Sequence, residues 1–160
     1  MEVEVKIRGL MMDPVTNMPI IVLKETCGEA VLPIWVGVFE ANAIAVEIEK
    51  SQLLRPLTHD LLCNVFGGLG TRIQKVVVSE LKEETFYAVI WAEREGEMVA
   101  FDARPSDALA LALRADCPIY VENDVLQRGK LTPGNADSTP EELRRWLDNL
   151  NDEDLGKYKM

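Results

Sequence analysis

Two short segments of the chain combine an Arg-Pro pair with acidic, hydroxyl and imidazole side chains, directly before an expected helix. The first segment, residues 55–60, reads RPLTHD and contains the single histidine of the sequence. Imidazole changes protonation near neutral pH, so His59 is a candidate general acid or base with Asp60 beside it, and Arg55 is a candidate phosphate ligand. In the alternative interpretation, Thr58 caps the helix, Asp60 complements the helix dipole and His59 is merely exposed.

The second segment, residues 102–107, reads DARPSD and leads from a strand into an apolar helix. The start of a helix offers free backbone N–H groups and partial positive charge, so Arg104 and Ser106 are candidate substrate ligands for a phosphate. Asp102 and Asp107 are candidate ligands for Mg²⁺. The alternative is structural: Ser106 or Asp107 caps the helix, and Arg104 forms an ion pair with Asp102.

Sharper catalytic motifs are absent from the sequence. It contains no Walker loop, dinucleotide glycine fingerprint, nucleophile elbow or paired zinc-ligand spacing. Glu40 and Glu47 lie seven residues apart on a predicted helix, where they are either additional metal ligands or part of its solvated side.

The elements that position these segments follow from hydrophobic spacing. Alternation predicts strands over residues 2–11, 19–23 and 31–36, and Pro33 places the third strand at a sheet edge or an irregularity. Apolar residues at helical spacing predict a helix over residues 39–50.

A second helix is expected to begin with Thr58 as its N-cap and to stop at the glycine pair 67–68. Its predicted buried face consists of Leu61, Leu62, Val65 and Phe66.

The second half of the chain predicts an antiparallel meander over residues 72–79, 85–93 and 98–102, since these runs are rich in Val and Ile and separated by turn residues. Pro105 opens a helix that is apolar around most of its circumference and is expected to be buried between layers, and residues 118–121 form a last strand. The predicted fold class is α+β: a mixed, largely antiparallel sheet with packed helices, in a single domain with a C-terminal helical tail.

The expected domain covers residues 1–128, and residues 129–160 form a linker and an amphipathic helix. Gly, Pro, Thr, Asn and Asp dominate up to position 137, and Thr139 with Glu142 then makes a capping-box pattern. The apolar stripe of this helix must pack on its own domain or on a second subunit. Its members are Leu143, Trp146, Leu147 and Leu150.

Composition limits the class of protein. The N-terminus lacks the basic region and apolar run of a secretory signal, and no apolar stretch approaches the ~20 residues that cross a bilayer. Cys27, Cys63 and Cys117 are scattered and predict buried thiols in a reducing compartment. We therefore expect a cytoplasmic protein without a membrane role. The net charge of −10 means that a nucleic-acid partner would require bridging metal ions or a locally basic patch.

Four separated blocks, in the correct order, resemble the bifunctional nuclease family. They read LPIWVG followed by EA and AI, RPLTHDL, FYA, and DARPSDA followed by ALA. The resemblance spans about residues 1–128. It implies an α+β fold around a mixed sheet, frequent dimerisation, and a nuclease activity on RNA and DNA of the kind ascribed to a plant relative. It implies no settled set of catalytic residues.

Two functions follow from these observations. The first is a phosphodiesterase assisted by Mg²⁺ or Mn²⁺ on Asp102 and Asp107, in which Arg55 or Arg104 holds the phosphate. Its candidate catalytic residues are His59, Asp60, Asp102 and Asp107. The second is a non-catalytic binding or assembly module, and for either function we expect a homodimer or higher homo-oligomer. Clustering of the polar residues in one cleft favours the enzyme, whereas separate ion pairs favour the module.

Overall fold

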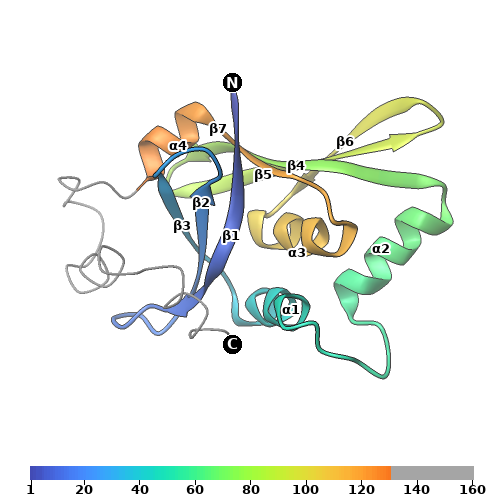
Figure 1. Ribbon diagram of the computed structural model, residues 1–160, viewed down its shortest axis with the longest axis horizontal. Coiled ribbons are helices and arrows are strands. Elements are labelled where there is room, and N and C mark those ends of the chain that lie inside the picture. Colours follow the sequence, from blue (N-terminus) through green and yellow to red (C-terminus); the bar gives the residue numbers. More distant parts are fainter. Residues whose placement is uncertain (131–160) are drawn as a thin grey trace.

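The computed structural model describes residues 1–130, in which seven strands form one sheet and four helices pack around it (Figure 1). The strands are β1 (Glu2–Met12), β2 (Pro19–Glu25), β3 (Val31–Trp35), β4 (Thr71–Lys82), β5 (Thr85–Arg94), β6 (Glu97–Ala103) and β7 (Ile119–Glu122). The helices are α1 (Val38–Ile48), α2 (Thr58–Gly68), α3 (Pro105–Ala115) and α4 (Asn123–Gly129).

The sheet consists of two antiparallel groups of three strands joined by one short strand. The order is β3-β2-β1-β7-β4-β5-β6, and β7 pairs antiparallel with β1 and parallel with β4. The predicted meander over β4, β5 and β6 is confirmed, as is the edge position of the strand that contains Pro33. The protein is therefore an α+β domain with a mixed, largely antiparallel sheet.

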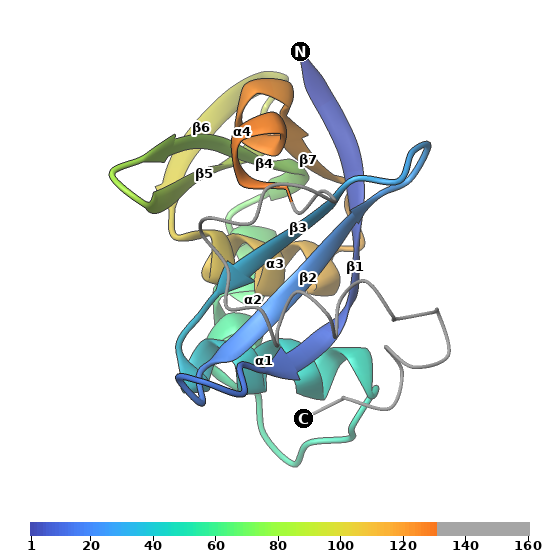
Figure 2. The same cartoon turned by 90° about the vertical axis from the view of Figure 1, so that its left-hand side faces the viewer.

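Helices α1 and α3 pack against each other, and α3 also contacts β4 and β5 (Figures 1 and 2). Pro105 occupies the first turn of α3, where its missing N–H costs no hydrogen bond. Leu109 and Leu111 are fully buried. The prediction of a helix buried between layers is confirmed, and this helix fixes the position of the residues at its N-terminal end.

The short helix α4 was not expected, because seven residues give too little periodicity to identify a helix. It contacts β3, β4 and β7 and contributes Val125 and Leu126 to the core. At its end, Gly129 lies so close to Leu32 and Phe86 that a Cβ atom there would approach Leu32 Cδ1 to 2.7 Å. Thus α4 joins the two groups of strands on the side away from α2.

Two predictions about α2 are wrong. The N-cap is Leu57 rather than Thr58, and the Leu57 backbone N–H donates to Asp60 Oδ2 at 2.9 Å. In addition, no residue of α2 is buried, and three members of the predicted buried face are exposed: Leu61, Leu62 and Val65. The main contacts of the helix are with α3 and β4, and Phe66 also meets Phe101 of β6. The rest of its apolar stripe is largely exposed within residues 1–130.

The prediction of three buried thiols is also wrong, because Cys27 lies in an exposed turn while Cys63 and Cys117 are half-buried. The helix predicted from Thr139 lies outside the described residues. None of the helices within residues 1–130 has the length and apolar character needed to span a membrane.

Candidate functional site

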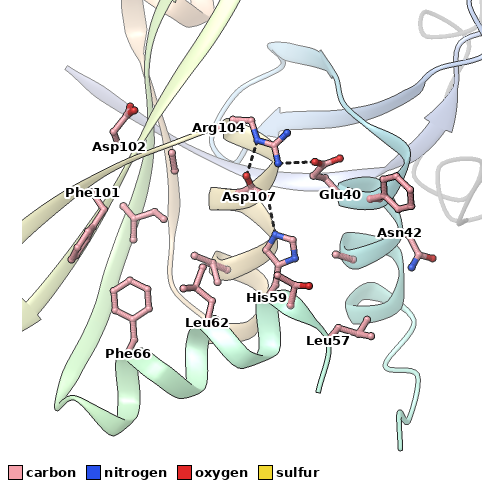
Figure 3. Close-up of a pocket in the computed structure, with 16 residues that line it drawn as sticks. Glu40, Asn42, Leu57, His59, Leu62, Phe66, Phe101, Asp102, Arg104 and Asp107 are labelled. Carbon is pink, nitrogen blue, oxygen red and sulfur yellow. Dashed lines mark hydrogen bonds and ion pairs between the residues drawn. The ribbon is translucent and has the colours of Figure 1, made fainter. Parts of the chain in front are cut away.

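A pocket of about 730 Å³ lies between α1, α2, α3 and β6 (Figure 3). Four residues of the two Arg-Pro segments that were predicted as site residues line it, namely His59, Asp102, Arg104 and Asp107, and so does Glu40, the candidate metal ligand on α1. The four come from both Arg-Pro segments, which are almost fifty positions apart in the chain, so the fold brings the two segments to one site. Its volume is within the range of small-molecule sites.

Asp107 is the centre of the polar cluster in this pocket. Its Oδ1 lies 2.9 Å from Nε2 of His59, and its Oδ2 accepts a hydrogen bond from Nε of Arg104 at 2.8 Å. Burial alone would raise the pKa of Asp107, but the hydrogen bonds from Arg104 and His59 outweigh it and lower the pKa below its usual value. Asp107 therefore remains a carboxylate at neutral pH.

Arg104 connects this cluster to α1. Its Nη2 lies 2.6 Å from Oε1 of Glu40, which is in the first turn of that helix. Arg104 is itself the N-cap residue of α3, so its extended backbone directs the side chain back over the first turn, where Asp107 follows three residues later. The guanidinium stays two-thirds exposed, and its Nη1 is not involved in either ion pair.

The pairing of His59 with Asp107 determines which nitrogen of the ring can carry out acid–base chemistry. An ionised carboxylate only accepts hydrogen bonds, so Nε2 must carry the proton in this contact. Neutral His59 then has its lone pair on Nδ1, which forms no hydrogen bond with any residue between 1 and 130. His59 is held in one orientation, with its side chain only 12% exposed, and this is the arrangement of an oriented general base.

Asp60 belongs to a second cluster, outside the pocket. Its Oδ1 accepts from Nε of Arg114 at 2.8 Å, and the same guanidinium donates to the carbonyl oxygens of Ala110 at 2.9 Å and Ala43 at 3.0 Å. Burial raises the pKa of Asp60, but the hydrogen bonds from the Leu57 N–H and from Arg114 lower it by more. The pKa of Asp60 is therefore below its usual value. Arg114 thereby ties the first turn of α2 to α1 and α3.

Arg55 lies beside this second cluster rather than beside Arg104. It lines a neighbouring pocket of about 340 Å³ together with Asp60 and Arg114. The two arginines of the Arg-Pro pairs therefore face different pockets.

Asp102 and Ser106 are close to the cluster in sequence but separate from it in space. Asp102 is exposed at the rim of the first pocket, and its carboxylate points away from Asp107 in Figure 3. The ion pair expected between Arg104 and Asp102 is not formed, because Arg104 engages Asp107 and Glu40 instead. Ser106 is buried and does not line the pocket.

The donor set of the pocket does not fit a metal ion held by the protein alone. Both oxygens of Asp107 are already engaged by Arg104 and His59, and Glu40 is engaged by Arg104. Across the part of the chain that the structure describes, no three His, Cys, Asp or Glu side chains are grouped as a metal site would require. Asp102 is the one carboxylate of this pocket that no other residue within 1–130 engages.

Sequence reasoning missed the aromatic wall of the pocket. Phe39 is 88% exposed at the rim, and Phe101 meets Phe66 edge to face with ring centroids 5.4 Å apart. Asn42 of α1 adds an amide to the lining of the same pocket, on the side opposite Phe66 and Phe101 (Figure 3). The signal available in the sequence was weak, since an aromatic residue at helical or strand spacing is typical of a core position.

The structure is thus an α+β domain in which a His–Asp pair and an arginine meet at the start of a buried helix. Comparison with known families shows more: the bifunctional nuclease domain matches residues 21–133. The chain belongs to the bifunctional nuclease domain family.

Relatives are found in bacteria and plants. An uncharacterized protein of Mycobacterium tuberculosis is 38% identical over 162 aligned residues, which cover 95% of this chain and 97% of that protein. Bifunctional nuclease 1 of Arabidopsis thaliana is 30% identical over 131 residues, covering 74% of this chain but 40% of the plant protein. Bifunctional nuclease 2 of Oryza sativa is 28% identical over 111 residues, covering 67% of this chain and 34% of the rice protein. The plant proteins thus extend well beyond the part that this chain matches.

Proposed function

We propose that the protein is a nuclease that hydrolyses phosphodiester bonds of RNA or DNA in the cytoplasm, with His59 as general base. The observation that carries this function is the 2.9 Å contact between His59 Nε2 and Asp107 Oδ1 inside a pocket that also holds Arg104. Membership of the bifunctional nuclease domain family and the names of the plant relatives support the same chemistry.

The steps follow from the orientation of these side chains. Nδ1 of His59 takes a proton from a water molecule as the water oxygen attacks phosphorus. The bond between phosphorus and the leaving oxygen breaks, and that oxygen takes up a proton from solvent water, while His59 later returns its proton to the solvent. Arg104 binds the non-bridging phosphate oxygens through its exposed guanidinium, and the Asp107 carboxylate stabilises the imidazolium that forms.

The pocket walls favour an unpaired nucleotide as substrate. Phe39 and Phe101 offer ring faces and edges on which a base can stack, and the Asn42 amide can bond to the edge of that base. A pocket of this size holds one nucleotide and not a duplex, and the net charge of −10 gives little general attraction for a polyanion. We therefore expect cleavage of single-stranded substrates.

Asp102 is the residue through which a metal ion would contribute to the reaction. Mg²⁺ often binds through one or two carboxylates together with substrate phosphates. Asp102 lies on the pocket rim, where no other residue within 1–130 engages it. We therefore expect Mg²⁺ or Mn²⁺ to bind there together with the substrate phosphate rather than to the protein alone.

The test is cleavage of fluorescent single-stranded RNA and DNA with Mg²⁺, with Mn²⁺ and with EDTA. His59→Gln and Asp107→Asn are expected to lose about 10²- to 10⁴-fold in rate, which is the usual contribution of a positioned general base. Asp124→Asn, a carboxylate in α4 that is 84% exposed, serves as the matched control and should cleave at the wild-type rate. Asp102→Asn should lose only the metal-stimulated part of the activity.

A binding or assembly module is the second candidate, because an unbroken line of ion pairs runs from Glu40 through Arg104 and Asp107 to His59 and can also hold α1, α2 and α3 together. Folded wild-type protein that cleaves neither substrate under any of the three metal conditions would favour this function. Equal cleavage by the wild type and His59→Gln would show that the activity does not come from this pocket.

A further inference from the structure

One arginine of the two Arg-Pro segments has no part in the reaction described above. Arg55 lines the neighbouring pocket of about 340 Å³, which we call the Arg55 pocket, as distinct from the larger His59 pocket. It is exposed, and its guanidinium forms no hydrogen bond or ion pair with any residue from 1 to 130. The hydroxyl group of Ser51 and the amide of Asn64 line the same pocket, and their side chains also have no partner in that range. Three donors of this kind are suited to bind an anion such as phosphate.

The charges around the Arg55 pocket favour an anion as well. Its two carboxylates are each paired with another cation. Oδ1 of Asp60 lies 2.8 Å from Nε of Arg114, and Oε1 of Glu47 lies 3.6 Å from Nζ of Lys50. Arg55 is therefore the cation of this pocket whose charge no carboxylate of the described domain neutralises.

The His59 pocket has the opposite balance of charge. Its lining includes the carboxylates Glu40, Asp102 and Asp107, but a single arginine, Arg104, which pairs with two of them. A nucleic-acid strand bound there alone meets little positive charge, on a chain whose net charge is −10. A positively charged pocket next to it supplies the locally basic surface that such a substrate requires.

The two pockets lie one after the other along α1 and the start of α2. Helix α1 lines the His59 pocket as far as Ala43 and the Arg55 pocket from Val46, a step of about 4.5 Å along the helix axis. On the other side, His59 lines the first pocket and its neighbour Asp60 lines the second. A strand with one nucleotide in the His59 pocket can therefore continue along the same two helices and bring its next phosphate to the Arg55 pocket.

We propose that the Arg55 pocket is a second phosphate subsite, which binds a phosphate adjacent to the one that is cleaved. This inference rests on the proposed nuclease function, because it assigns Arg55 to the same substrate. The planar guanidinium of Arg55 donates to the non-bridging oxygens, and Ser51 and Asn64 donate to the same phosphate. The preferred substrates are then oligonucleotides, rather than a dinucleoside monophosphate, whose only phosphate is the one that is cleaved.

The first test compares cleavage of a single-stranded octanucleotide with cleavage of a dinucleoside monophosphate of the same bases. The wild type should prefer the octanucleotide in kcat/KM. Arg55→Gln should reduce this preference about 10-fold, the usual effect of losing a hydrogen bond to a charged group. Arg128→Gln removes the same charge from α4 and is the matched control, which should keep the wild-type preference. Thermal unfolding checks that the variants are folded.

The second test measures binding without cleavage, by the fluorescence anisotropy of a labelled octanucleotide whose phosphorothioate linkages resist hydrolysis. The salt concentration is varied while Mg²⁺ is held constant. Loss of one phosphate contact on a single strand should reduce the slope of log K against log salt by about 0.7 in Arg55→Gln. Arg55→Lys keeps the charge and should keep the slope.

Failure of the subsite and failure of the nuclease function give different results. An unchanged octanucleotide preference or an unchanged salt slope in folded Arg55→Gln would overturn the inference, whatever the effect of His59→Gln on cleavage. An equal fall in cleavage of both substrates would also overturn it, since Arg55 would then act at the cleaved phosphate. If the wild type cleaves neither substrate, the nuclease function fails and the salt slope decides whether Arg55 binds a phosphate. A wild type that neither cleaves nor binds would overturn both.

Discussion

Replacing Arg114 with methionine should destabilise the domain more than any other single change to a charged residue near the site. Its side chain is only 5% exposed, and it donates to Asp60 and to the carbonyl oxygens of Ala43 and Ala110. Methionine fills much of the same volume but offers no donor, so one carboxylate and two carbonyl groups lose a partner together.

The magnitude follows from this geometry. Removing one partner of a buried ion pair costs about 3–5 kcal/mol. The lower end applies here, because Asp60 remains 29% exposed and keeps its hydrogen bond from the Leu57 N–H. We therefore expect Arg114→Met to lower the free energy of unfolding by about 3 kcal/mol, which corresponds to a fall of about 10 °C in Tm for a domain of this size.

Urea unfolding at neutral pH measures this loss, with Arg128→Met as the matched control. Arg128 is 55% exposed, forms a weak ion pair with Asp124 at 3.9 Å and donates to the exposed Leu81 carbonyl oxygen at 2.9 Å, so its replacement should cost less than about 1 kcal/mol. A loss below about 1 kcal/mol for Arg114→Met as well would refute the assignment of Arg114 as the link between α1, α2 and α3.

The same pair predicts a pH dependence. The pKa of Asp60 is lowered in the folded state, so the stabilisation is complete above the ordinary value of 3.8 and is lost as the pH falls below it. The wild type should lose this stability in acid, and Arg114→Met should show a smaller decrease over the same pH range.

Three further outcomes are expected. Leu109→Ala, at a position with 0% exposure in the core, should cost about 2–5 kcal/mol in urea unfolding; a loss below this range would mean that α3 is not packed between the layers. Asp13→Asn should cost about 1–3 kcal/mol, because buried Asp13 accepts hydrogen bonds from the Val15 N–H and the Trp35 indole at 2.8 Å each; an unchanged unfolding midpoint would contradict this role. Burial raises the pKa of half-buried Cys117 to about 11, so iodoacetamide at mildly alkaline pH should label exposed Cys27 first and Cys117 much more slowly, as followed by peptide mass spectrometry; equal labelling rates in the folded protein would contradict this.

The strands could be predicted from sequence because their signals are local. Alternation, β-branched residues and turn residues identified all seven strands, and of the two positions that Pro33 allowed for β3, an edge or an irregularity, the structure has the edge. Helix α4 could not be predicted in this way, since seven residues complete only two turns. The stripe on α2 predicted that an apolar face exists but not what covers it, because amphipathicity carries no information about the partner.

The candidate site was predicted only in part. Both helix starts were identified, and His59 and Asp107 do meet, but the sequence suggested Asp60 as the neighbour of His59. Adjacent residues on a helix point in different directions, so Asp60 turns to Arg114 instead. The rotation of α2 relative to α3 decides that His59 meets Asp107 and that Asp60 meets Arg114. This rotation depends on packing between segments far apart in the chain. Arg114, a charged residue in the last turn of the otherwise apolar helix α3, was the feature of the sequence that could have indicated a buried ion pair.

The position of β7 has a consequence for how the domain is made. This four-residue strand is the last of the seven in the chain, yet it lies between β1 and β4 and supplies the hydrogen bonds that join the two groups of strands. During synthesis, both groups are complete before residues 119–122 are available. Until then, the facing edges of β1 and β4 remain open, and open edges are the sites at which chains pair wrongly. Closure of the sheet therefore has to wait until residues 119–122 have been made, and a nascent chain halted before them exposes two strand edges to other chains.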